Sequence, residues 1–70
     1  ASMGEMISLI AHQWRQPLNI ISIQSQKLSL QYMVSDEIDP DEATKVLEEI
    51  KQRADELSNI IEDFQSFIEI

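Results

Sequence analysis

The sequence feature that most constrains the fold is an apolar repeat in the second half of the chain. Apolar side chains recur there at alternating steps of four and three residues, at Ala43, Leu47, Ile50, Ala54, Leu57, Ile61, Phe64 and Ile68. Val46, Ile60 and Phe67 widen this stripe on one side. The spacing predicts a helix over about residues 40–68. Its apolar face is broader than a two-stranded coil needs and suits a helix with several neighbours in a bundle.

The first half of the chain carries a comparable stripe, which predicts a second helix over about residues 3–34. Its members are Met3, Ile7, Ile10, Trp14, Pro17, Ile21 and Leu28. Gln24 and Gln31 interrupt it, either as polar residues that set register inside a bundle or as residues at its edge. We interpret Trp14 as a core residue, because it lies on the apolar side.

A short turn over about residues 35–39 separates the two predicted helices. Asp39 is a good helix cap, Pro40 suits the first helical position, and Glu42 follows three residues after the cap. A connection this short makes the two helices antiparallel neighbours. Residues 1–70 are thus expected to form one all-α domain, an antiparallel helical hairpin.

Seventy residues without cysteine build only a small core. Each hairpin also has apolar stripes wider than one partner helix covers. We therefore expect two copies to form a homodimer, in which the paired hairpins make a four-helix bundle.

Charge is distributed unevenly along the chain. Residues 1–34 hold one acid and two bases, a net +1, whereas residues 35–70 hold twelve acids and three bases, a net −9. The acidic half reads as a solvated helix face, and a nucleic-acid partner is disfavoured because no basic stripe is present. The sequence has no residue spacing typical of a metal site. It also has no membrane-spanning run and no signal peptide, so we expect a cytoplasmic fragment without membrane contact. The longer parent protein from which it comes could still be anchored in a membrane.

The only histidine, His12, lies five residues before a proline inside a predicted helix. Pro17 cannot donate a backbone hydrogen bond, and an interior proline costs a helix roughly 3 kcal/mol. Helical periodicity places His12 opposite the apolar stripe, on a polar side of the helix. An ordinary surface histidine is the simplest explanation, and a functional site is the alternative.

The residues around His12 favour the functional site. The run Ile10-Ala11-His12, then Arg15, then Gln16-Pro17-Leu18-Asn19 resembles the phosphoacceptor box of sensor histidine kinases. In that family the usual order is His, an acidic residue, an aliphatic residue, Arg, Thr or Asn, Pro and Leu. The chain as a whole resembles the dimerisation and histidine-phosphotransfer domain of these two-component kinases.

The resemblance implies that His12 accepts the γ-phosphoryl group of ATP and passes it to an aspartate of a response regulator. Gln13 replaces the family's acidic residue and can orient the imidazole but cannot act as a general base at neutral pH. Arg15 either balances phosphate charge or is a solvated arginine. Gln16 stands where related kinases position a water for phosphatase chemistry. Pro17 is either a bend that improves packing or a hinge for signalling.

The resemblance also implies partners. The chain has one glycine and no phosphate-cradling loop, so we expect it to be inactive as a kinase alone. ATP and Mg²⁺ are expected on a separate catalytic domain of a longer parent, and no cofactor or metal is expected on this fragment. A response-regulator receiver domain is expected to contact outward residues below the histidine, namely Asn19, Ile20, Ile23 and Lys27.

Two other interpretations remain open. The chain is alternatively a non-catalytic dimeric bundle or coiled-coil signalling module in which His12 is incidental. A monomeric four-helix phosphotransfer domain is disfavoured, because two helices cannot build that bundle within one chain.

Overall fold

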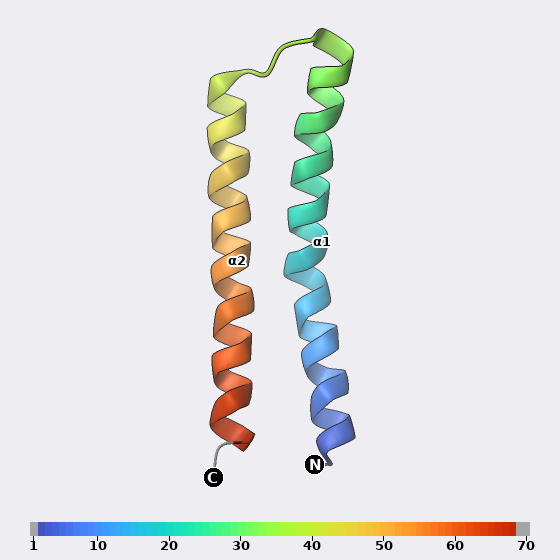
Figure 1. The fold of residues 1–70 in the computed structure, drawn as a ribbon, viewed down its shortest axis with the longest axis vertical. Coiled ribbons are helices and arrows are strands. Elements are labelled where there is room, and N and C mark those ends of the chain that lie inside the picture. Colours follow the sequence, from blue (N-terminus) through green and yellow to red (C-terminus); the bar gives the residue numbers. More distant parts are fainter. Residues whose placement is uncertain (1, 69–70) are drawn as a thin grey trace.

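Two long helices lie side by side and run in opposite directions (Figure 1). The computed structural model describes the backbone of residues 2–68 and the side chains of residues 2–66. Helix α1 spans Met3–Ser35 and helix α2 spans Pro40–Ile68. They form a rod whose principal extents are 52 × 17 × 10 Å. The prediction of an all-α helical hairpin is confirmed. Neither described helix is long and apolar enough to cross a membrane.

Local side-chain and backbone bonds set where each helix begins and ends. The hydroxyl of Ser2 accepts a hydrogen bond from the Glu5 backbone N–H at 3.1 Å and caps α1. At the start of α2, a carboxylate oxygen of Asp39 accepts from the Asp41 N–H at 3.2 Å. Helix α1 ends at Ser35, and the next residue, Asp36, caps it with a left-handed backbone (φ 61°) and an N–H that donates to the Tyr32 carbonyl at 2.8 Å. Aspartate is one of the few residues other than glycine that adopts this conformation readily.

The contact between α1 and α2 buries little. Among the described side chains only Pro17 and Val46 are buried, with Val46 at 2% exposure. The half-buried residues on the inner faces are Met6, Ile10, Trp14, Ile20, Ile21, Gln24, Leu28 and Gln31 in α1 and Glu42, Ala43, Glu49, Ile50, Arg53, Leu57, Ile60, Ile61 and Phe64 in α2. One hairpin therefore has an interface but not the closed core that a stable small domain needs.

Part of the predicted apolar stripe is not covered within one chain. Ile7 and Leu47 were expected on the packed face but remain 57% and 62% exposed, and Met3 and Ala54 are exposed as well. A single neighbouring helix covers only a narrow stripe of another helix, so the outer part of a broad stripe stays open. The predicted stripe residues Phe67 and Ile68 have side chains outside the described residues.

An ion pair joins the two helices near the connecting turn. The ammonium of Lys27 lies 2.9 Å from a carboxylate oxygen of Glu42. Glu42 is the third residue of α2, and its side chain bonds to α1 rather than back to the cap of its own helix. The hydrogen bond and charge of Lys27 hold the pKa of Glu42 below its ordinary value of 4.5.

We predict that this ion pair makes the hairpin less stable in acid. The pKa of Glu42 is lower in the folded chain than in the unfolded chain, so its contribution is fully present above about pH 4.5 and is lost as the pH falls through the folded pKa. Thermal unfolding by circular dichroism should show a Glu42→Gln variant melting below the parent chain at pH 7.

The difference between the two melting temperatures should shrink at pH 3. Glu48→Gln, an exposed glutamate of the same helix with no ion pair among the described residues, is the matched control and should leave the melting temperature at pH 7 nearly unchanged. Equal melting temperatures for the Glu42→Gln variant and the parent at pH 7 would contradict the assignment.

Candidate functional site

His12 lies on the side of α1 that faces away from α2. Pro17 is buried against α2, and His12 lies five residues earlier, which places it about 140° around the helix from Pro17. The side chains of His12, Arg15, Gln16 and Asn19 are all exposed. The imidazole is therefore open to a second protein domain, as the periodicity predicts.

The polar surroundings of His12 differ from a metal site. Within the described residues no group of three or more histidine, cysteine or acidic side chains is arranged to hold a metal ion.

Arg15, three residues after His12, forms no ion pair with a described residue, so its guanidinium is available to an incoming anion.

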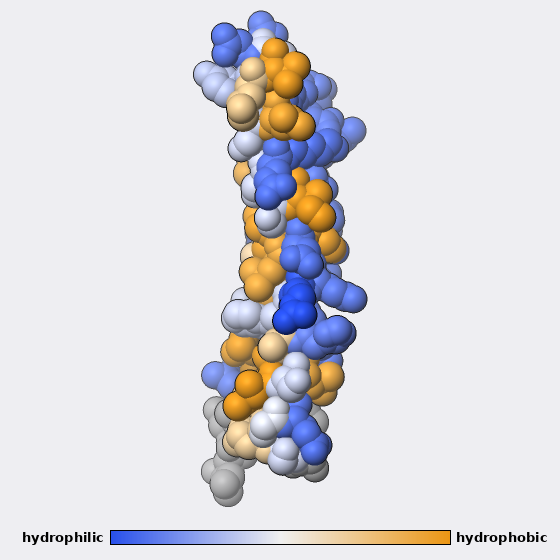
Figure 2. Space-filling model, turned by 90° about the vertical axis from the view of Figure 1, so that its right-hand side faces the viewer, coloured by the Kyte–Doolittle hydropathy of each residue, from blue (hydrophilic) through white to orange (hydrophobic). Residues whose placement is uncertain are grey.

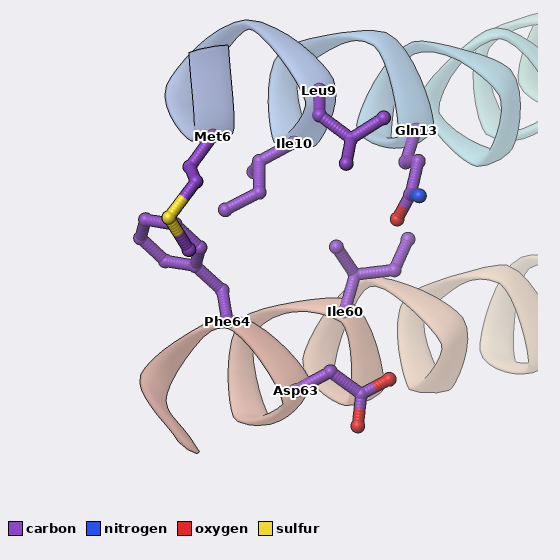
Figure 3. Close-up of a pocket in the computed structure, with 7 residues that line it drawn as sticks. All are labelled: Met6, Leu9, Ile10, Gln13, Ile60, Asp63 and Phe64. Carbon is purple, nitrogen blue, oxygen red and sulfur yellow. The ribbon is translucent and has the colours of Figure 1, made fainter. Parts of the chain in front are cut away.

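Gln13 lies next to His12 in sequence but is turned toward α2. It lines an open groove of about 560 Å³ together with Met6, Leu9, Ile10, Ile60, Asp63 and Phe64. The Gln13 amide and the Ile60 side chain point toward one another across this groove, whereas Asp63 points away from α1 (Figure 3). The residue that replaces the family's acidic position thus lies between the imidazole and the second helix.

A second groove continues along the same side, one turn further along α1. It has a volume of about 320 Å³ and is lined by Gln13, Gln16, Pro17, Ile20, Arg53, Glu56 and Ile60. Ile20 was expected to be exposed as a partner contact, but here it is half-buried against α2. It lies only about 60° around the helix from buried Pro17, which explains the difference. Ile23, by contrast, is 63% exposed.

Arg53 is the main contribution of α2 that the sequence interpretation missed. One terminal nitrogen lies 3.2 Å from a Glu56 carboxylate oxygen and the other lies 3.8 Å from Glu49. The side chain is only 21% exposed, and its Nε is buried without a hydrogen-bond partner among the described residues. The signal was present in the sequence, because Arg53 follows Ile50 by three residues and precedes Leu57 by four, which places it on the inner face.

Trp14 lies on the opposite side of the α1–α2 contact from Gln16. It is half-buried and lines a shallow groove with Leu57, Ser58, Ile61 and Glu62. Its indole nitrogen is buried without a partner among the described residues. This position agrees with the interpretation of Trp14 as a packing residue.

A comparison with models of known protein families identifies the kind of domain to which these features belong. The model of one family, the His Kinase A (phospho-acceptor) domain, matches residues 2–69. The chain belongs to this family. No match was found among curated proteins or among solved structures. The match spans both helices of the His Kinase A domain, so it covers the whole hairpin and not only the box around His12.

The geometry of this His Kinase A domain predicts that His12 can be replaced without loss of stability. The side chain is exposed and makes no hydrogen bond or ion pair with a described residue. A His12→Gln variant should therefore change the free energy of unfolding by no more than about 0.5 kcal/mol. Chemical denaturation followed by circular dichroism measures this change.

The same denaturation experiment on a Val46→Ala variant shows, for comparison, the effect of changing a buried side chain. Val46 is 2% exposed, so removal of two methyl groups from this position should lower the stability clearly. A His12→Gln variant as unstable as Val46→Ala would show that the imidazole has a structural role.

Proposed function

We propose that this chain is the phosphoacceptor and dimerisation domain of a two-component sensor histidine kinase, with His12 as the phosphoacceptor. The observation that carries the proposal is the exposed His12 in a chain that belongs to the His Kinase A family. His12 is its only histidine. Its position away from α2 leaves room for an ATP-bearing catalytic domain, where ATP and Mg²⁺ bind.

The first chemical step is attack by a neutral imidazole nitrogen on the γ-phosphorus of ATP. An N–P bond forms, the bond between the γ-phosphorus and the ADP oxygen breaks, and the imidazole loses its proton. Gln13 carries an amide, which cannot accept this proton at neutral pH, so solvent receives it. Arg15 offers a guanidinium without an ion-pair partner among the described residues, and we assign it to balance the phosphate charge.

The second step transfers the phosphoryl group to a receiver-domain aspartate. The N–P bond breaks and a carboxylate oxygen of the regulator forms the new bond to phosphorus. We assign the regulator contacts to Asn19, Ile23 and Lys27. Ile20 is half-buried and lies beneath this surface. Gln16 is exposed at the position where an amide can orient a water that hydrolyses the aspartyl phosphate of the regulator to carboxylate and inorganic phosphate.

The phosphoacceptor assignment predicts that His12 carries the label. The purified chain, incubated with ATP, Mg²⁺ and a separately produced catalytic domain of the parent kinase, should gain phosphate that is labile in acid and stable in base. The His12→Gln variant should lose this label, because no other histidine is present to accept the phosphate. Radiolabelled ATP and gel autoradiography measure the transfer.

A small phosphoryl donor tests the reactivity of His12 without requiring a catalytic domain to dock. Phosphoramidate should phosphorylate exposed His12 without any catalytic domain. Labelling of the His12→Gln variant equal to that of the parent chain would show that another residue accepts the phosphate. A folded dimer that accepts no label at all would instead support the non-catalytic bundle.

Dimerisation is assigned to one flank of the hairpin. Leu18 and Gln16 lie on either side of buried Pro17, each about 100° around α1. The flank that contains Leu18, here called the Leu18 flank, also includes Ile7 and Trp14, and on α2 it includes Leu47, which lies about 40° from Ile61 around that helix. Ile7, Leu18 and Leu47 are all exposed in the single chain. A second copy would bury them.

The opposite side, here called the Gln16 flank, contains Ile20, Ile23 and Lys27 beside the second groove. Figure 2 shows the outward face of α1, which lies between the two flanks, and there apolar patches are separated by polar side chains. This mixed surface suits a partner that binds and leaves, as a regulator does.

The two flanks predict opposite effects for two matched substitutions. Leu47→Glu and Ile23→Glu each place a charge at an exposed apolar position, with exposures of 62% and 63%. Leu47→Glu should convert the dimer to a monomer in multi-angle light scattering, because a charge in the dimer core is unpaired. Ile23→Glu should leave the dimer mass unchanged.

The same pair is then tested for phosphoryl transfer to the regulator. Ile23→Glu should slow transfer from phosphorylated His12 to the receiver aspartate by about tenfold or more, the cost of one unfavourable contact at an interface. Two outcomes would contradict the assignment of the flanks. One is a monomeric mass for the unsubstituted chain. The other is a dimer that persists in the Leu47→Glu variant and is lost in the Ile23→Glu variant.

A further inference from the structure

Pro17 leaves one gap in the hydrogen-bond ladder of α1, and this gap faces α2. Proline has no backbone N–H, so the Gln13 carbonyl has no donor four residues ahead of it. Pro17 is buried, which places the missing bond on the side of the helix that α2 covers. A carbonyl on a covered side needs a donor other than bulk water.

Arg53 is the residue of α2 with an unused donor near this gap. Its side chain lines the same groove as Gln13 and Pro17. Glu49, Gln52 and Glu56 hold the two terminal nitrogens of the guanidinium. The Nε–H is buried and has no partner among the described residues, so one donor of Arg53 is unused.

We propose that Arg53 is a positioning residue for the phosphoacceptor turn. Its Nε–H, which has no direct partner among the described residues, is linked to the Gln13 carbonyl that Pro17 leaves unpaired through one water in the groove, whose volume of about 320 Å³ admits a water. Helix α2 thereby holds the turn of α1 that lies between His12 and Pro17. The bond itself does not depend on the proposed function, whereas its effect on phosphoryl transfer does.

A double-mutant cycle between Arg53 and Pro17 tests the bond. Arg53→Met should lower the ratio of folded to unfolded chain by about tenfold, the effect expected for a charged hydrogen bond. Pro17→Ala restores the N–H that the Gln13 carbonyl needs, so Arg53→Met should cost clearly less in that background. The loss of the contacts to Glu49 and Glu56 is the same in both backgrounds and cancels.

Lys51→Met is the matched control for the cycle. Lys51 pairs with Asp55 on the exposed side of α2, with a nitrogen to oxygen distance of 3.3 Å. Its substitution should have the same small effect with Pro17 and with Pro17→Ala. All variants are measured by urea unfolding at one protein concentration, because the stability of a dimer depends on concentration. Equal costs of Arg53→Met in both backgrounds would overturn the proposal.

NMR spectroscopy measures hydrogen bonding at the Gln13 carbonyl directly. In the ¹³C,¹⁵N-labelled chain, the Gln13 carbonyl carbon is detected through the Trp14 N–H. Arg53→Met should move this carbon resonance upfield, as loss of a hydrogen bond to the carbonyl does, and Lys51→Met should not move it. An unmoved Gln13 resonance in Arg53→Met would overturn the proposal even if the variant were less stable.

The positioning role is tested by the rate at which His12 is phosphorylated. Arg53→Met should slow labelling by the catalytic domain by about tenfold or more, since a small misplacement of a reacting group is costly, while Lys51→Met should not slow it. A moved Gln13 resonance with an unchanged labelling rate would overturn the positioning role. If His12 of the parent chain accepts no phosphate, the proposed function fails, and the cycle and the resonance still test the bond.

Discussion

The packing of α1 against α2 is the contact on which every other assignment depends. Pro17 and Val46 are the only buried side chains among those described, so this narrow line of contact determines which way each helix faces. Once Pro17 is turned to α2, helical geometry places His12 about 140° away, in solvent. The outward position of His12 is thus a consequence of where the apolar residues of α1 lie, and not of any bond made by the imidazole.

The same contact divides the hairpin into two unlike flanks. The Leu18 flank has exposed apolar side chains on both helices, and its nearest ion pair is Lys51–Asp55, which begins one helical turn after Leu47. The Gln16 flank contains Gln13 and Gln16, the Arg53 guanidinium and the Lys27–Glu42 ion pair. Association through one flank and transient docking on the other are compatible because the two surfaces do not compete for the same residues.

A proline and an arginine on facing helices also place polar groups inside an apolar contact. An arginine at an inner position is costly unless its charge is paired and its donors are used. Glu49 and Glu56 pair the charge of Arg53, and Pro17 leaves the Gln13 carbonyl without its donor in the helix. The two irregular residues are therefore best explained together, since each provides what the other lacks.

The sequence by itself determined the class of fold, the turn between the helices and the outward position of His12, because these follow from periodicity and capping within one chain. It also indicated the family, through the run from Ile10 to Asn19. Only the tertiary structure decided that Ile20 packs inward, that Glu42 bonds to Lys27 rather than to its own helix cap, and that Arg53 lies beside Pro17. These relations join residues on different helices. Their register depends on how two helices with broad stripes settle against one another, which a pattern along a single helix does not specify.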